Sequence, residues 1–296
     1  MTEAVMGLDL KIQPNCTFGF LGPNGAGKTT TIKMLLGLVR PTRGGGCVLH
    51  RPLGDQDVRK YIGFLPEEPA FGRHLKAREF LTLCAKLSHV EPNEQRQRVE
   101  KALQTVRLDH RAGSRLAEFS RGMLQRIGIA QALLHDPTLL ILDEPMTGLD
   151  PPGRREIKEI MLDLRQREKT IFFSSHILSD VEELCDSVGI LNRGRLVLAG
   201  PLADLLAASG VEYTVTNMPA TLLPSLEPLV AGMQKKHNQW ILQVTDEAHQ
   251  ETVREILKRG GCSDAESRRL RKNLDDVFME TIEADNERRG KETQHG

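Results

Sequence analysis

Short apolar runs alternate with amphipathic stretches along the first two thirds of the chain. Four runs are compact and bounded by Pro, Asp or Ser, which is typical of buried parallel strands. They are Thr17–Leu21, Tyr61–Leu65, Thr138–Leu142 and Thr170–Ser174. Residues Pro152–Glu168 repeat apolar side chains at the i, i+3, i+4, i+7 spacing of a helix. Strands that alternate with helices predict an α/β fold.

The pattern changes to helix only between Phe71 and Phe119, with candidate helices at Glu79–Leu87 and Asn93–Val106. We therefore expect a helical insert over about residues 71–135 of the α/β domain. Two later apolar runs, joined by Arg-Gly-Arg, predict a β-hairpin that closes this domain near residue 200. The runs are Ser187–Asn192 and Leu196–Ala199.

From Pro201 the pattern restarts as a smaller unit, so we expect domains at 1–200 and 201–296. Strands and helices of this unit are expected at Glu212–Thr216 (strand), Thr221–Met233 (helix), Trp240–Val244 (strand), Glu247–Lys258 (helix) and Asn273–Ala284 (helix). The last dozen residues are polar and predict a frayed tail. The second unit is predicted to be a small accessory α+β domain.

Composition excludes several classes of protein. The 296 residues include 40 Lys and Arg against 40 Asp and Glu, so the chain has no overall field that would draw it onto nucleic acid or an anionic membrane. No apolar stretch approaches the roughly 18 to 20 residues of a spanning helix, and the N-terminus has no signal-peptide core. The five cysteines contain no CxxC pair, which disfavours a zinc knuckle or a disulfide framework. These features favour a cytosolic globular protein.

A phosphate-binding loop is the strongest chemical signal. Residues 22–29 fit G-x-x-x-x-G-K-[ST], with a predicted strand before them and a helix after them. The candidate nucleotide-binding residues are Gly22, Pro23, Asn24, Gly25, Ala26, Gly27, Lys28, Thr29 and Thr30. Backbone N–H groups and the helix N-terminus would hold phosphates, while Lys28 adds a charge and Thr29 a hydroxyl for Mg²⁺. A turn that binds nothing is the alternative.

Two carboxylates follow the apolar run Leu139–Leu142. Ligands bind at the carboxyl edge of parallel sheets, so Asp143 would hold Mg²⁺ and Glu144 would orient or deprotonate an attacking water. Solvated residues at a strand end are the alternative. Together with the phosphate loop, this pair predicts a nucleotide triphosphatase.

Three further segments narrow the class: FSRGMLQR at 119–126, DEPMTGLD at 143–150 and SSHI at 174–177. This ordered set resembles the ATP-binding subunits of ABC transporters over roughly the first 200 residues. The resemblance implies that Ser120 and Gly122 contact the γ phosphate of ATP on an opposite subunit. It also implies that Asp150 lies in the loop joining the two sites and that His176 is the switch histidine. Taken alone, Ser120 also suits a helix N-cap, and a lone histidine also suits a satisfied core or surface position.

Three departures from the family pattern alter this expectation. Glu67 stands where the family commonly has a glutamine that senses Mg²⁺, and it can still coordinate a hard cation. The signature has Arg121 and Met123 in place of smaller or amide residues. No aromatic residue before Phe18 can stack on adenine as the family's does, so we expect either weaker adenine contact or a chain that begins late.

The signature form and the stretch at Asn273–Thr281 resemble exporters of drugs, polysaccharides or lipids whose permease is a separate chain. The resemblance implies a homodimer or heterodimer around ATP and Mg²⁺, held peripherally on the inner face of the cell membrane by a permease that engages Glu67 and Phe71–Phe80. No nucleic acid is expected. A soluble ABC ATPase acting on ribosomes or nucleic acid is the alternative, disfavoured because Lys28 and Ser120 lie only 92 residues apart without a heptad run or zinc spacing. A P-loop kinase would not need Ser120, Gly122 or His176.

Overall fold

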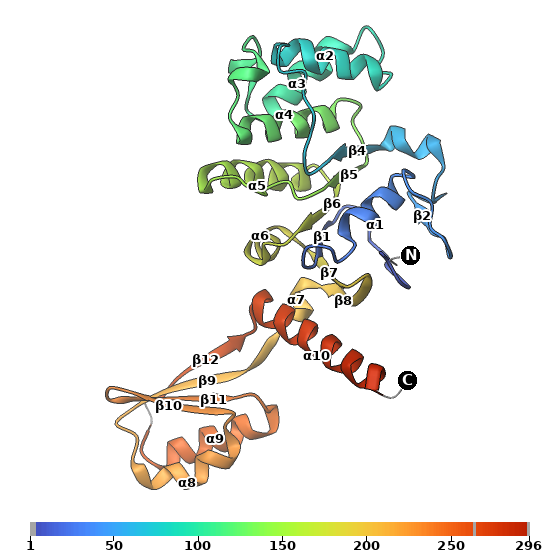
Figure 1. Cartoon of the computed structure of the whole chain (residues 1–296). Helices are drawn as coiled ribbons and strands as arrows, with labels where there is room; N and C mark the ends of the chain where they lie inside the picture. The colour runs from blue at the N-terminus through green and yellow to red at the C-terminus, as the bar shows by residue number, and fades with distance from the viewer. Residues whose placement is uncertain (1–3, 263–264, 295–296) are drawn as a thin grey trace. The chain divides into compact units, whose positions relative to one another are not determined.

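The computed structural model describes residues 4–262 and 265–294, and its contacts divide the chain into two compact units. The first comprises residues 1–202 and 281–296, and the second residues 203–280. We expected residues 281–296 in the accessory domain, whereas they group with the first unit (Figure 1). No helix among the described residues combines the length and the apolar character that crossing a membrane requires.

The first unit is built on a six-stranded sheet in the order β4-β5-β6-β1-β7-β8, parallel except for β8. Its strands are β1 (Thr17–Leu21), β4 (Ile62–Leu65), β5 (Leu139–Leu142), β6 (Thr170–Ser175), β7 (Ser187–Asn192) and β8 (Arg195–Pro201). Its helices are α1 (Lys28–Leu35), α2 (Ala77–Leu87), α3 (Gln95–Thr105), α4 (Arg121–Leu133), α5 (Pro151–Gln166) and α6 (Leu178–Leu184). The expected α/β fold and helical insert, α2 to α4, are present.

Strand β1 packs against helices on both of its faces. Phe18 and Phe20 lie in a core cluster with Ile32 of α1, and the Phe18 ring is 5.8 Å from that of Phe172 on β6. On the other face, a Cβ on Gly19 would lie 2.6 Å from Val181 of α6. Phe18 and Phe20 on one face and Gly19 on the other therefore determine how α1 and α6 pack on β1. The loop between β1 and α1 is positioned by the same packing.

A short hairpin of β2 (Cys47–Val48) and β3 (Arg51–Pro52) was not predicted. Leu49 and His50 form its turn, both with positive φ, +50° and +63°. Two-residue turns of this kind usually contain Asn or Gly, so the sequence gives no turn signal here.

The second unit is an antiparallel sheet in the order β10-β11-β9-β12 with helices on one face. Its elements are α7 (Leu202–Leu205), β9 (Ala208–Thr216), α8 (Leu223–Leu226), β10 (Gly232–Lys236), β11 (Gln239–Val244), α9 (Glu247–Arg259) and β12 (Glu266–Arg271). Helix α10 (Leu274–Gln294) follows.

Two predictions in this region were wrong. The helix expected at 221–233 is shorter. Its α-helical part ends at Leu226, because Pro228 cannot donate in a helix interior, and a 3-10 helix continues to Leu229. Gly232–Lys236 instead pairs with β11. The expected frayed tail is helical to Gln294. An i,i+4 ion pair, Arg289 to Asp285 at 3.3 Å, and a hydrogen bond from Asn192 to Asp285 stabilise it.

Candidate functional site

The phosphate loop lies between β1 and α1, as expected. Gly25 and Gly27 have φ of +79° and +108°, which favour glycine, and a Cβ on Gly27 would lie 2.4 Å from the Ala4 carbonyl oxygen. The Pro23 carbonyl accepts the Ala26 N–H at 3.1 Å. Lys28, Thr29 and Thr30 form the first turn of α1. The helix N-terminus therefore opens directly from the loop, the arrangement that binds phosphate.

Lys28 is almost fully buried. Its ammonium donates to the Gly22 carbonyl oxygen at 2.7 Å and lies 3.3 Å from Oε1 of Glu144. Both side chains are 7% exposed, so the pair is shielded from solvent. A cation held at this point faces the loop that would receive the phosphates.

Glu144 contacts two further side chains, those of Thr147 and His176. Its Oε2 accepts from the Thr147 hydroxyl at 2.8 Å and lies 2.8 Å from Nδ1 of His176, whose side chain is 43% exposed. The residue has φ of +48°, an uncommon conformation for a non-glycine residue. Strain of this kind persists where the surroundings impose it, and it is typical of functional sites. Sequence analysis did not single out Thr147, whose only signal is its place within DEPMTGLD.

Ser174, at the end of β6, links the two carboxylate residues. Its hydroxyl donates to Oδ1 of Asp143 at 2.6 Å and accepts the Glu144 N–H at 2.9 Å. Asp143 is 2% exposed, and its own N–H donates to the Leu65 carbonyl oxygen. One buried hydroxyl thus fixes the Asp143 carboxylate and the Glu144 backbone relative to each other. Ser174 has no motif of its own beyond its place before His176.

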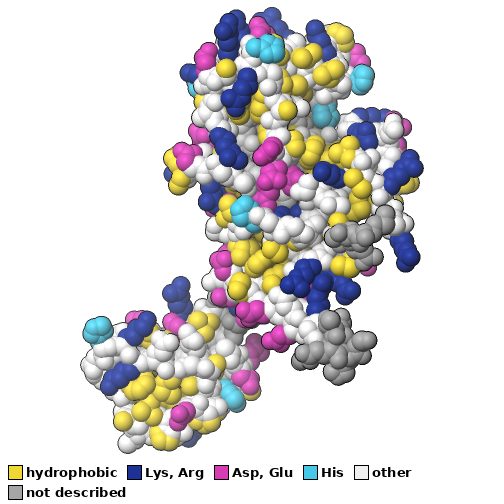
Figure 2. All heavy atoms as spheres, in the orientation of Figure 1, with side chains coloured by type: hydrophobic (Ala, Val, Ile, Leu, Met, Phe, Trp, Pro, Cys, Tyr) yellow, Lys and Arg dark blue, Asp and Glu magenta, His cyan; other side chains and the backbone are white. Residues whose placement is uncertain are grey.

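The donor set fits a hard cation bound together with phosphates. No cluster of three or more His, Cys, Asp or Glu suited to a metal occurs in the described part of the chain. Mg²⁺ usually needs only one or two protein oxygens beside substrate phosphates and waters, which Asp143 and Thr29 can supply. Glu67 is exposed and lines a hollow of about 360 Å³ together with Arg73, Phe119 and Arg121. Figure 2 shows acidic side chains gathered on the visible face of the larger unit.

Ser120, Gly122 and Asp150 form a second group at the N-termini of α4 and α5. Ser120 caps α4 by accepting the Met123 N–H at 3.3 Å, and Asp150 caps α5 by accepting the Gly153 N–H at 3.2 Å. A Cβ on Gly122 would lie 3.7 Å from Cα of Gly153, so the two N-termini are neighbours. Among the residues that the structure describes, no hydrogen bond or ion pair joins Ser120, Gly122 or Asp150 to the phosphate loop.

Arg121, an unusual residue in the signature, covers the loop before α5. Gly148 has φ of +70°, and a Cβ there would lie 2.5 Å from Cζ of Arg121. The guanidinium therefore lies directly against the backbone that leads to Asp150. The sequence showed that Arg121 departs from the family pattern but not what it contacts.

Replacing Gly148 by Ala tests the backbone conformation of this loop. We expect Gly148→Ala to destabilise the protein by about 1 kcal/mol, because a side chain is strained at this positive φ, whereas the exposed Arg121 guanidinium can move aside at little cost. The loss should be the same in an Arg121→Ala background. Urea unfolding measures both values, with Gly113→Ala as the control because nothing lies within 4 Å of a Cβ there. A loss that falls by half in the Arg121→Ala background would show that the contact with Arg121, and not strain, sets the cost.

A buried carboxylate joins α5 to α6. Asp180 is 1% exposed, and its two oxygens lie 2.8 and 2.7 Å from Nη2 of Arg154. Lys158 lies 3.0 Å from the same carboxylate. Arg154 is four residues after Asp150 and Asp180 is four residues after His176. The two candidate loops thus lead into helices held by one ion-pair cluster.

Comparison with known proteins agrees with this geometry. Residues 5–147 match the family described as ABC transporter. The chain is 35% identical to YxlF of Bacillus subtilis, an uncharacterized ABC transporter ATP-binding protein, over 95% of both chains. It is 36% identical to the linearmycin resistance ATP-binding protein LnrL of Bacillus subtilis, over 76% of this chain and 74% of the relative. A solved ATP-binding subunit of an ABC transporter has a TM-score of 0.61 and 34% identity, over 68% of this chain and 85% of that one.

Coverage is lower for two other relatives. An uncharacterized ABC transporter ATP-binding protein of Nostoc sp. is 47% identical, and one of Synechocystis sp. is 46% identical. The match with the Nostoc protein spans 63% of that protein and 71% of this chain. The match with the Synechocystis protein spans 58% of that protein and 69% of this chain.

Proposed function

The chain belongs to the ABC transporter family of ATP-binding proteins, and on that premise we propose that it is the ATPase subunit that powers export through a separate membrane permease. The observation that supports ATP hydrolysis best is the cluster in which the buried Glu144 contacts Lys28, Thr147 and His176 beside the phosphate loop. Support for export comes from the linearmycin resistance relative. The permease would hold the subunit at the inner face of the membrane.

The residues have separate roles in this proposal. Lys28 and the loop N–H groups bind the β and γ phosphates, and Glu144 takes the proton of the attacking water. His176, already 2.8 Å from Glu144, holds that carboxylate and reaches toward the γ phosphate. Asp143 and Thr29 hold Mg²⁺, which neutralises phosphate charge when bound. Ser174 keeps Asp143 and Glu144 in fixed relation while this occurs.

Two subunits would enclose two ATP molecules. The first N–H groups of α4 have no partner within the helix, and the absence of a side chain at Gly122 leaves that end open. Such an end attracts an anion, which the ATP of a second subunit would supply. Asp150, at the neighbouring helix N-terminus, would then lie on the same dimer face.

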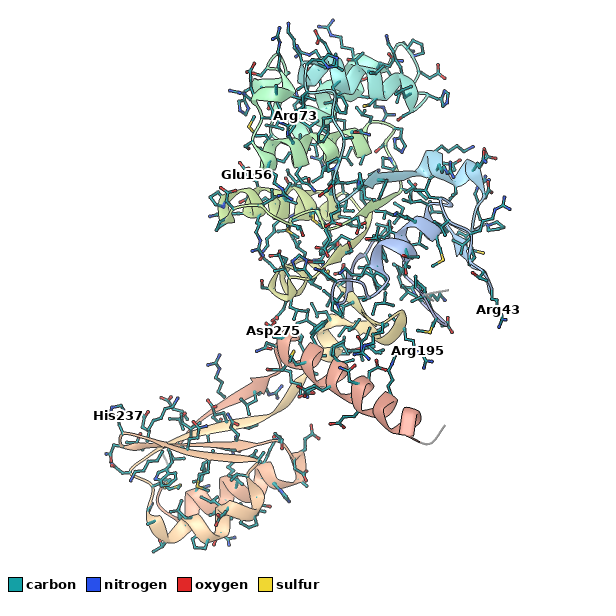
Figure 3. All side chains as sticks on the ribbon, viewed as in Figure 1. Arg43, Arg73, Glu156, Arg195, His237 and Asp275 are labelled. Atoms are coloured by element: carbon teal, nitrogen blue, oxygen red, sulfur yellow. The ribbon has the colours of Figure 1, made fainter. Side chains whose placement is uncertain are left out.

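The permease would dock in the hollow that Glu67, Arg73 and Phe119 line. This hollow lies between the strand end after β4 and the helical insert, where Arg73 is labelled in Figure 3. Charged and aromatic side chains together suit a short amphipathic helix of a partner. Glu67 would then sense the permease rather than the metal alone.

Dimerisation is testable with the hydrolysis-deficient variant Glu144→Gln. We expect size-exclusion chromatography with light scattering to give a monomer without nucleotide and a dimer with Mg-ATP, because unhydrolysed ATP keeps the two faces joined. Ser120→Arg in the same background should abolish the dimer by blocking the α4 N-terminus, while an Arg155→Ala control, 82% exposed on α5, should not. A monomer that binds ATP but never dimerises would contradict the homodimer.

A further inference from the structure

Helix α10 belongs to both compact units. Its first turns, to Glu280, group with the accessory unit, whereas residues from Thr281 group with the unit that contains the phosphate loop. Leu274 is fully buried and Glu280 lies in an ion-pair contact with Lys272. The helix is therefore anchored at its beginning by the accessory unit.

Its second half is anchored on the last residue of β7. Asn192 is 3% exposed, and its amide donates to Oδ2 of Asp285 at 2.7 Å. Arg289, one turn further on, lies 3.3 Å from the same carboxylate. A buried amide with a charged acceptor forms one of the stronger hydrogen bonds available to a helix surface.

The residues on either side of Asn192 contact the phosphate loop at two points. Gly194 donates its N–H to the Ala26 carbonyl oxygen at 2.8 Å. A Cβ on Gly22 would lie only 2.3 Å from the Leu191 carbonyl oxygen, so the two backbones approach each other closely. Asn192 itself pairs across the hairpin with Arg195, which is labelled in Figure 3.

We propose that Asp285 is a positioning residue for the phosphate loop, acting through Asn192, so that the docking of the second half of α10 raises nucleotide affinity. When α10 is docked, Asp285 fixes Asn192, and the hairpin turn holds Gly22 and Ala26 in the geometry that receives phosphates. When α10 is displaced, the turn loses that anchor and the loop binds ATP more weakly. This coupling rests on the proposed binding of ATP at the phosphate loop, and it requires neither a permease nor a dimer.

A charge exchange between the two residues tests the proposal. Asn192→Asp places two carboxylates together, and we expect the Kd for Mg-ATP to rise about fivefold with kcat changed by less than about twofold. The double variant Asn192→Asp/Asp285→Asn restores one amide and one carboxylate in reversed order, and the Kd should return toward the wild-type value. Glu287→Ala, exposed on the same helix, is the matched control.

Binding is measured by isothermal titration calorimetry well below the melting temperature, so that a purely structural effect changes the melting temperature and not the Kd. A raised Kd that the double variant does not restore would overturn the proposal, as would an unchanged Kd in Asn192→Asp. Asp285→Ala replaces the first variant if that one does not fold, since Asp285 lies on the helix surface at 16% exposure.

The wild-type protein gives a second, independent readout. Because coupling between sites is reciprocal, Mg-ATP must strengthen the docking of α10 if α10 strengthens Mg-ATP binding. We expect amide hydrogen exchange in residues 282–292 to slow about fivefold with nucleotide, and that slowing to be lost in Asn192→Asp. Unchanged exchange on binding would overturn the proposal.

Discussion

Glu144→Gln should lower ATP turnover by about 10³-fold, the usual contribution of a general base. The amide has the size of the carboxylate but cannot take the proton of an attacking water. ATP affinity should be kept or increased, because Lys28 lies 3.3 Å from the Glu144 carboxylate and loses its attraction to that group. Steady-state phosphate release measures the rate, and equilibrium binding of Mg-ATP measures the affinity.

The exposed Glu68 provides the matched control, since Glu68→Gln removes one charge after β4, the strand paired with β5. Among the described residues, Glu68 forms no hydrogen bond or ion pair with the Glu144 cluster. Its turnover should be that of the wild type. Wild-type turnover in Glu144→Gln would show that another group is the base, and His176 would then be examined first because it lies 2.8 Å from the same carboxylate.

Lys28→Ala should weaken Mg-ATP binding by about 10²-fold, the loss of charge-assisted contacts worth about 3 kcal/mol. The change also leaves the buried Glu144 carboxylate without its nearest cation, which further disfavours a bound anion. Turnover should fall to background for both reasons. Calorimetric titration with Mg-ATP measures the affinity.

Lys33→Ala is the control for this variant, because Lys33 is on the same helix but exposed. It should bind ATP as the wild type does. Lys28→Arg should not restore affinity, since the planar guanidinium does not fit the buried space between Gly22 and Glu144. Affinity within about twofold of wild type in Lys28→Ala would exclude the proposed phosphate contact.

Elements with buried faces were predictable from the sequence. Strands β1, β4, β5 and β6 are short apolar runs because both faces are covered, and α5 shows the periodicity of a helix with one buried stripe. Elements that depend on pairing with another strand rather than on a buried face were not predictable in the same way. Strand β12 reads ESRRLR, without alternation between apolar and polar residues, and it forms because it pairs with β9.

The same distinction applies to the candidate site, where some residues belong to local motifs and others are recognised only by their contacts. Lys28, Asp143 and Glu144 belong to local motifs, so their positions in the fold could be anticipated, and their assigned roles stay predictions until the variants are made. The hydroxyls of Thr147 and Ser174 were missed because their importance depends on contacts with Glu144 and Asp143. The bond from Asn192 to Asp285 joins residues 93 positions apart and leaves no trace in either local sequence.

The ion-pair cluster at Asp180 has a mechanical consequence. Arg154 and Lys158 both come from α5, and one buried carboxylate of α6 binds both, so the two helices resist sliding as well as separation. Asp150 caps α5 and His176 lies just before α6, so both loops lead into helices that one carboxylate joins. We therefore expect a displacement of one loop to be transmitted to the other through these helices.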